Sequence, residues 1–309
     1  MNLRHRSSLA TMSFALTLFA PFALRAQAPA AQAPPDFSKV EIKTTKLADN
    51  FYVLEGQGGA IGVVPGPDGV FMVDSQFAPL SEKIAAAIKQ ISDRPIKFLV
   101  NTHVHGDHTG GNENFGKMGV TILARPQLRD RLEHPSPGAN GQPGVPTPAA
   151  GLPLITYDAP LTLQLNGEEI HLIPAPKAHT DGDTFVQFVK ANVIMTGDFY
   201  RSIQYPNIDR TNGGSLPGLV DALNAVIKAA GPATKIVPGH GPVVDRAAVT
   251  AHRDMVIAIR DKVAKLVKEG KTQEQVVAAK PTADYDAKVQ QPGTTADRFV
   301  GQLYAELKK

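Results

Sequence analysis

The segment NTHVHGDHTGGN, residues 101–112, contains three histidines and one aspartate within the six residues from His103 to His108. The chain has only nine histidines, so a third of them lie here. The apolar run IKFLV before the segment predicts a buried strand, and the glycine pair after it permits a sharp turn. A lone histidine is usually a packed polar residue, but H-x-H-x-D-H at a strand end indicates a metal site.

The spacing within this segment predicts two neighbouring metal positions. His103 and His105 should point the same way, because side chains alternate along a strand. Asp107 and His108 follow where the strand is expected to turn, so they can face a second point close to the first. Imidazole and carboxylate donors suit zinc, and also iron or manganese. The chain has no cysteine, which excludes thiolate ligands and disulfides.

The remaining ligands should come from the ends of other strands. His179 lies in APKAHTDGDT, Asp198 ends NVIMTGD and His240 ends KIVPGH. Each follows an apolar segment and lies beside a glycine turn. Three further histidines match no motif and are interpreted as ordinary surface or packing residues: His134, His171 and His252.

Strand-like runs and helical patterns alternate along the chain, in two successive halves. Strands are expected at residues 40–45, 51–55, 60–64, 70–74, 96–103, 161–165, 169–175, 184–189, 192–197 and 235–240. Helices are expected at Ser81–Ile91, at 216–230 with Ser215 as the N-cap, and over most of the last sixty residues, where Gly270 should end one. Two strand-rich halves with helices outside predict an α/β fold, a layered helix/sheet/sheet/helix sandwich.

The N-terminal residues are typical of a secretory signal peptide. Arg4 and Arg6 precede an apolar run at 9–24, which ends before the small residues AQA. This run contains Pro21 and is shorter than the roughly 20 residues that a membrane-spanning helix needs, so cleavage is favoured over anchoring. We therefore expect a periplasmic or secreted protein with no stable membrane insertion after cleavage.

Four regions are expected: a signal peptide at 1–28, a flexible leader at 29–39, a core domain at 40–245 and a C-terminal helical extension at 246–309. Within the core, residues 134–151 (HPSPGANGQPGVPTPAAG) form a long loop rich in proline and glycine. Loops of this length in compact domains are often functional.

The charge balance argues against nucleic acid as a partner. The chain has 32 basic and 29 acidic residues. Arg4, Arg6 and Arg25 leave with the signal peptide, which has no acidic residue, so 29 basic residues remain against 29 acidic ones. A chain without excess positive charge lacks the electrostatic attraction on which nucleic-acid binding depends.

Asp74, residues 103–108, His179, Asp198 and His240 together resemble the five ordered motifs of the metallo-β-lactamase-fold superfamily, over about residues 40–245. The resemblance implies an αββα sandwich of two mixed sheets with a dinuclear metal site at one edge. The segments HTDGDT, TGDFY, NGGS and KIVPGHGPV are similar to those of exported bacterial hydrolases within this superfamily.

The resemblance also implies a role for each residue. His103, His105 and His179 would bind the first zinc ion. Asp107, His108 and His240 would bind the second, and Asp198 would bridge both. Asp74 would orient the histidine block through hydrogen bonds. Two zinc ions with two carboxylates and a hydroxide carry a net charge of about +1, which favours an anionic small-molecule substrate, and metal lowers the pKa of bound water to roughly 7.

The expected function is therefore that of an exported dinuclear zinc hydrolase, in which a metal-bound hydroxide, oriented by Asp107, attacks a small ester, lactone or amide. β-Lactams are among the candidates, although Asp198 resembles the glyoxalase, lactonase and nuclease branches, whereas dedicated β-lactamases have Cys or Ser there. Arg201, three residues beyond Asp198, and Asn212 in NGGS resemble substrate-binding residues of one lactamase branch. A surface arginine and a turn asparagine fit the same pattern equally well.

Two other classes stay open. One is a mononuclear iron dioxygenase, which would leave Asp107, His108 and His240 partly unused. The other is a non-catalytic or relay protein on the same fold, which is usually marked by lost ligands. The complete set of seven ligands argues against both.

Overall fold

A computed structural model of the protein describes residues 36–137, 141–289 and 293–308. The expected signal peptide lies outside the described residues, as do residues 29–35 of the expected leader. The folded unit begins at Asp36, within that leader. A short 3₁₀ turn, η1 (Phe37–Lys39), is held by Lys83, whose Nζ donates hydrogen bonds of 2.7 Å to the carbonyls of Ser38 and Val40.

The first sheet contains, among the described residues, seven strands in the order β1 to β7. Neighbouring strands are antiparallel from β1 to β4 and parallel from β4 to β7. The strands are β1 (Lys43–Ala48), β2 (Phe51–Glu55), β3 (Ile61–Val64), β4 (Val70–Val73), β5 (Ile96–Val100), β6 (Thr121–Ala124) and β7 (Ile155–Thr156).

The second sheet has five strands within the described ranges, in the order β12-β11-β10-β9-β8. Its strands are β8 (Leu161–Leu165), β9 (Glu168–Pro174), β10 (Thr184–Phe188), β11 (Val193–Met195) and β12 (Lys235–Val237). Only the pair β11 and β12 is parallel there. Both sheets are thus mixed.

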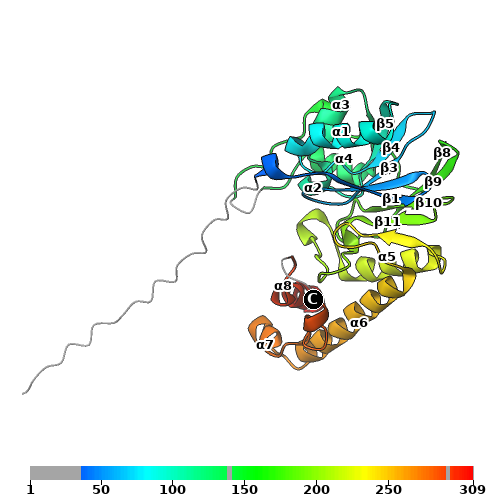
Figure 1. The fold of residues 1–309 in the computed structure, drawn as a ribbon. Helices are drawn as coiled ribbons and strands as arrows, with labels where there is room; N and C mark the ends of the chain where they lie inside the picture. Colours follow the sequence, from blue (N-terminus) through cyan, green and yellow to red (C-terminus); the bar gives the residue numbers. More distant parts are fainter. Residues whose placement is uncertain (1–35, 138–140, 290–292, 309) are drawn as a thin grey trace, which may run out of the picture. The chain divides into compact units, whose positions relative to one another are not determined.

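Helices cover the outer faces of the two sheets (Figure 1). The side of the first sheet carries α1, α3 and α4, and the side of the second carries α5 and α6 (Figure 1). The α-helices are α1 (Ser81–Ile91), α2 (Gly106–Thr109), α3 (Asn112–Lys117), α4 (Pro126–Glu133), α5 (Leu216–Ala229), α6 (Arg246–Lys268), α7 (Gln273–Ala278) and α8 (Ala296–Leu307). The predicted αββα sandwich is confirmed.

Strand β4 shows why its residues lie in the middle of the sandwich. All four of its side chains are buried. Phe71 and Val73 pack between the two sheets, whereas Val70 and Met72 pack under α1. Successive side chains leave a strand on opposite faces, so a strand covered on both sides must be apolar throughout. The sequence VFMV satisfies this requirement and ends at Asp74, beside the candidate site.

The helices at 81–91 and 216–229 form as predicted from the sequence. The Ser215 hydroxyl accepts a hydrogen bond from the Gly218 amide and so caps α5. Helix α6 ends at Lys268, and Gly270 takes a φ of 77°, a left-handed conformation that favours glycine after a helix. Helices α2, α3 and α4 were not expected, because each is short and only weakly periodic.

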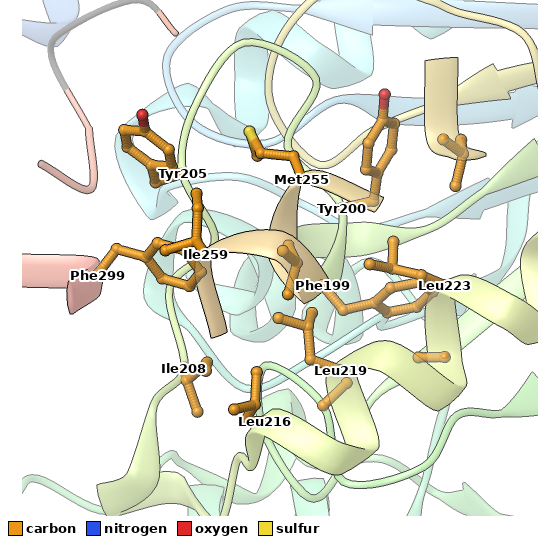
Figure 2. Packing of buried hydrophobic residues seen from close by; sticks show 14 of the residues in the cluster. Phe199, Tyr200, Tyr205, Ile208, Leu216, Leu219, Leu223, Met255, Ile259 and Phe299 are labelled. Atoms are coloured by element: carbon orange, nitrogen blue, oxygen red, sulfur yellow. The ribbon is translucent and has the colours of Figure 1, made fainter. Parts of the chain in front are cut away.

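The C-terminal helices share one apolar core with the second sheet. Met255 and Ile259 of α6 and Phe299 of α8 pack with Leu219 of α5 and with Phe199, which follows β11 (Figure 2). The described residues of the extension, 246–289 and 293–308, are therefore part of the same compact unit as the sandwich. Among the residues that the structure describes, no helix has the length and apolar character needed to cross a membrane.

Candidate metal centre

The histidine segment begins where β5 ends. The strand stops at Val100, and residues 101–105 form a bend that leads into α2. The expectation that His103 and His105 lie on a regular strand was therefore wrong. The two imidazoles still face one point, but they present different nitrogens: Nε2 of His103 and Nδ1 of His105. Asp107 and His108 lie on the single turn of α2.

The ends of this segment are fastened to each other. Nδ2 of Asn112 donates to Oδ1 of Asn101 over 2.8 Å, and Nδ2 of Asn101 donates to Oδ1 of Asn112 over 3.1 Å. Both asparagines are fully buried, and the Ser75 hydroxyl donates a further hydrogen bond to Asn112. These hydrogen bonds close the segment into a loop of fixed shape.

Two groups of side chains could each hold a metal ion, and they share Asp198. The first consists of His103, His105, His179 and Asp198, and the second of Asp107, His108, Asp198 and His240. In each group the ligand atoms lie within 4.8 Å of one another. The structure thus brings all seven residues selected from the sequence together around one carboxylate.

The hydrogen bonds around the first group fix which nitrogen of each imidazole carries its proton. Nδ1 of His179 lies 2.6 Å from the carbonyl oxygen of Asn207, which can only accept, so Nδ1 is the donor. Nε2 of His105 likewise lies 2.7 Å from the carboxylate of Asp209. The lone pairs of the two rings, at Nε2 of His179 and Nδ1 of His105, then face each other across 3.0 Å. Two acceptors this close are stabilised by a cation between them.

Asp74 fixes the second group and links it to the first. Its carboxylate accepts hydrogen bonds of 2.7 Å from Nδ1 of His108, from the Thr102 amide and from the Thr102 hydroxyl. Because that hydroxyl is already a donor to Asp74, Nδ1 of His103, 3.1 Å away, must donate to it. The Nε2 atoms of His103 and His108 are thereby directed towards Asp198.

Several of the atoms that could bind metal are buried and have no hydrogen-bond partner. Within the described ranges, Oδ1 of Asp198 and the Nε2 atoms of His103, His108 and His240 are buried without a hydrogen-bond partner. His108 and His240 each place Nε2 only 3.2 Å from Oδ1 of Asp198 without forming a hydrogen bond. Buried polar atoms are normally satisfied, so this cluster fits metal ligands.

The protonation states of His103, His179 and the two carboxylates suit metal binding. Burial lowers the pKa of His103, and it lowers the pKa of His179 to about 4, which keeps both imidazoles neutral. Burial would raise the pKa of Asp198, but His108 and His240 beside it hold that pKa well below the ordinary value. The pKa of Asp107 is lowered to about 2, because His240 and His108 outweigh its burial. Neutral imidazoles and ionised carboxylates are the forms that bind metal. His108 and His240 differ, because the neighbouring carboxylates outweigh burial and raise the pKa of both imidazoles, so each would release a proton when a metal binds.

Two glycines make room for two of the ligands because they have no side chain. A side chain at Gly59 would meet the His108 ring at 2.0 Å, and one at Gly239 would meet Oδ1 of Asp198 at the same distance. Gly239 also donates its amide to the carbonyl of Gly197, next to Asp198. Replacing either glycine would displace a ligand.

Arg201 and Asn212 lie next to the two groups. Nε of Arg201 is 3.6 Å from Oδ2 of Asp198, and its side chain is 15% exposed. The Asn212 amide donates to Oδ2 of Asp209 over 2.7 Å and, through its oxygen, accepts from Arg131 over 3.3 Å. Asn212 therefore holds Asp209 in this structure, and Asp209 in turn holds His105.

Asn207 and Asp209 are the functional residues that sequence reasoning did not find. They belong to the loop between β11 and α5 and carry no motif by which they could be selected. Asp209 lies 104 positions from the histidine that it contacts. The nearby glycine pair in NGGS marks a turn but does not indicate which polar side chain reaches the site.

A model of the metallo-beta-lactamase superfamily matches residues 50–240, which include every ligand of both groups. The chain belongs to the metallo-beta-lactamase superfamily. A linear primary-alkylsulfatase from Pseudomonas sp. (strain ATCC 19151) is 36% identical to it over 77 residues. That match covers 23% of this chain but only 15% of the alkylsulfatase.

Two solved structures with low sequence identity share the fold. The metallo-beta-lactamase from Pontibacter korlensis superposes with a TM-score of 0.57 at 20% identity and covers 70% of this chain and 99% of its own. The stereoselective inverting sec-alkylsulfatase Pisa1 from Pseudomonas sp. superposes with a TM-score of 0.64 at 16% identity, over 85% of this chain and 50% of its own. The chain thus corresponds to a whole lactamase but to half of that sulfatase.

Proposed function

We propose that this protein is a hydrolase with two zinc ions that cleaves a small anionic ester, lactone or amide. The observation that carries the proposal is the convergence of two ligand groups on the shared carboxylate of Asp198. Four imidazoles, those of His103, His105, His108 and His179, have their outer nitrogens engaged, so the other nitrogen of each faces that carboxylate.

Nitrogen and oxygen donors without a thiolate suit zinc, with iron or manganese as alternatives. When bound, two such ions would lower the pKa of a water molecule into the neutral range and neutralise negative charge that develops on the substrate. The chain's own residues would hold that arrangement. Asp107 and His240 are partly exposed and so face the solvent side, where a water molecule and a substrate can enter. Asp107, ionised at neutral pH, can both bind metal and orient water.

A cleft of about 670 Å³ reaches the centre at His105 and is large enough for a small molecule. Asp209 and Asn212 are among the residues that line it. Part of its wall is apolar and comes from the bend at residues 101–105, from α4 and from the described parts of the long loop, with Val104, Leu132, Pro135, Pro137, Val145, Pro146 and Pro148. We propose that this wall accommodates the apolar part of the substrate. On this proposal, residues 135–137 and 145–148 of the long loop contribute to substrate binding.

Arg201 is proposed to bind the anionic part of the substrate. Its guanidinium is mostly buried next to Asp198, and Nε has no hydrogen-bond partner among the described residues. A guanidinium can bind a carboxylate or a sulfate through two hydrogen bonds at once. The remaining donors of Arg201 are thus suited to an anion placed beside the centre.

A second candidate function is hydrolysis of a sulfate ester. The alignment with the linear primary-alkylsulfatase favours it, although that alignment covers a small part of the relative. An alkyl sulfate also combines an anionic head with an apolar tail, which matches the two features proposed for this site. Carbonyl and sulfate substrates therefore need to be compared directly.

The test begins with the metal content of the purified chain. Elemental analysis should find close to two zinc ions per chain, and His105→Ala or Asp107→Ala should abolish turnover by removing ligands. One iron and no zinc would favour the dioxygenase alternative instead.

The zinc-loaded protein would then be assayed on β-lactam, lactone, thioester, phosphodiester and alkyl sulfate probes. Hydrolysis of at least one probe, lost in both ligand variants, is the expected result. Two bound zinc ions without turnover on any probe would instead favour a non-catalytic protein.

A further inference from the structure

We propose that the C-terminal helix α8 positions two ligands of the first metal position through the side chain of Gln302. The metal ligands themselves come from the sandwich, and none lies on α8. The connection runs through the loop between β11 and α5. The inference rests on the proposed two-metal site, but not on the identity of the substrate.

The loop at residues 205–210 orients two histidines of the same group. The Asn207 carbonyl accepts the hydrogen bond from Nδ1 of His179, and the Asp209 carboxylate accepts the one from Nε2 of His105. The Asp209 amide also donates to the carbonyl of His179 over 2.9 Å. A shift of this short segment would rotate both rings, because each has its outer nitrogen bonded to it. The position of the segment thus controls the direction of both lone pairs.

Gln302 binds the residue between these two contacts. Its Oε1 accepts from the Ile208 amide over 3.1 Å, and its Nε2 donates to the Ile208 carbonyl over 3.1 Å and to Oδ1 of Asn207 over 2.9 Å. One side-chain amide thereby binds both backbone groups of Ile208, a residue that is 1% exposed. The Ile208 carbonyl also accepts from the Arg210 amide over 3.1 Å, whereas the Ile208 amide is bound by Gln302. Buried backbone groups need partners, so Gln302 is the natural anchor for this segment.

Apolar packing holds α8 against the same loop. The rings of Tyr205 and Phe299 stack with centroids 5.6 Å apart and planes 11° from parallel. Ile208 packs towards Leu216 of α5 on the other side (Figure 2). The Tyr205 hydroxyl donates to the carboxylate of Asp286, in the segment that leads to α8, over 2.7 Å. The extension therefore contacts the loop at several points, and Gln302 is the one that binds Asn207, whose carbonyl holds the ring of His179.

The second metal position has a different support. His108 is oriented by Asp74 at the end of β4, and neither residue contacts α8 in any recorded interaction within the described ranges. Loss of the Gln302 contacts should consequently weaken one metal position and spare the other. A purely structural role for Gln302 would not produce this selectivity.

Gln302→Leu removes all three hydrogen bonds while keeping a side chain of similar size. Tyr304→Phe on the same helix is the matched control. The Tyr304 hydroxyl donates to the carbonyl of Lys271 over 3.2 Å, so this variant also loses a hydrogen bond of α8, but one that is remote from the loop. Gln302→Glu keeps the acceptor for Ile208 and loses both donors, and it serves if the leucine variant does not fold.

Metal-free full-length protein would be titrated with Co²⁺ in competition with a chelator, and both binding steps would be followed by absorption. His179→Ala and His240→Ala identify which step belongs to which position. Gln302→Leu should weaken the His179-dependent step about 10- to 100-fold and leave the His240-dependent step within about threefold, as is usual for residues behind a metal ligand. Tyr304→Phe should lower the melting temperature and change neither step.

Equal weakening of both steps in Gln302→Leu, or no change in either, would overturn the inference. A wild-type chain that bound fewer than two ions would instead overturn the proposed two-metal function. The two failures are distinguishable, because the first appears only in the variants and the second already in the wild type.

Discussion

Asn101 and Asn112, the first and last residues of the histidine segment, exchange two hydrogen bonds between their side-chain amides, at 2.8 and 3.1 Å. Neither residue is a metal ligand. Their pairing closes the loop that carries four of the seven ligands, so its geometry is set before any metal binds. An arrangement fixed in advance avoids the entropic cost of ordering the ligands on binding.

Breaking this pair should destabilise the metal-free protein. Asn112→Ala leaves Oδ1 of the buried Asn101 without its donor and leaves Nδ2 with only the 3.4 Å hydrogen bond to the His108 carbonyl, at a cost of about 1–3 kcal/mol in the free energy of unfolding. Urea unfolding of the metal-free chain measures it. In a double-mutant cycle, Asn101→Ala should lower the free energy of unfolding clearly less in the Asn112→Ala variant than in the wild type. The reason is that the second mutation removes the amide that the first one left unpaired. Fully additive effects would mean that the two side chains act independently.

Asp209 should control the affinity of the first metal position. Asp209→Ala removes the acceptor for Nε2 of His105. The ring can then turn, and its Nδ1 becomes a weaker metal ligand. Metal affinity should fall about 10- to 100-fold at that position, as measured by competition with a chelator. Asp209→Asn keeps an acceptor oxygen and should lose less. An unchanged affinity in both variants would leave Asp209 with a role only in its hydrogen bonds to Asn212.

Arg201 should affect binding of anionic substrates more than turnover. Because the anionic group does not react, Arg201→Ala should raise KM with little change in kcat. Loss of a hydrogen bond to a charged group costs roughly 1.5–3 kcal/mol, or about 10- to 150-fold in kcat/KM. Steady-state kinetics on an anionic substrate and on a neutral lactone tests this, with Arg201→Lys retaining the charge.

The neutral substrate is the control for Arg201, and its hydrolysis should be almost unaffected. Equal losses on both substrates would show instead that Arg201 supports the Asp198 loop, which its 3.6 Å approach to that carboxylate also permits.

His252 should make the protein less stable in mild acid. It lies on α6 with its ring 5.0 Å from that of Tyr200, and burial lowers its pKa to about 4. Below about pH 6.5 the unfolded chain takes up a proton at this residue and the folded chain does not, so stability is complete above this pH and falls towards pH 4. The shift corresponds to about 3 kcal/mol at the acid end.

Replacing His252 should therefore flatten this part of the pH profile. Metal-free wild type and His252→Leu would be unfolded in urea at several values between pH 7 and pH 4, with His134→Ala as an exposed control. The difference in unfolding free energy between wild type and His252→Leu should shift in favour of the variant as the pH falls. A pH-independent difference would contradict the assignment of a neutral buried imidazole.

The ligand set and the layered fold could be predicted from the sequence because both depend on local patterns. Apolar runs such as VFMV predict strands covered on two faces, and Ser215 and Gly270 mark helix ends through their own backbone preferences. Histidines and aspartates that follow such runs necessarily gather at strand ends. The types of ligand atom then limit which metal ions the site can bind, whatever its detailed geometry.

Tertiary structure alone determined how those ligands are held. The bend at residues 101–105 makes His105 present Nδ1 rather than Nε2, which strand periodicity did not predict. Asp209 and Gln302 act over separations of 104 and 94 positions, from a loop and from a helix without a motif. A hydrogen bond depends on where the folded chain places two polar atoms, and a polar residue in a loop has the same sequence signature whether it reaches a histidine or solvent.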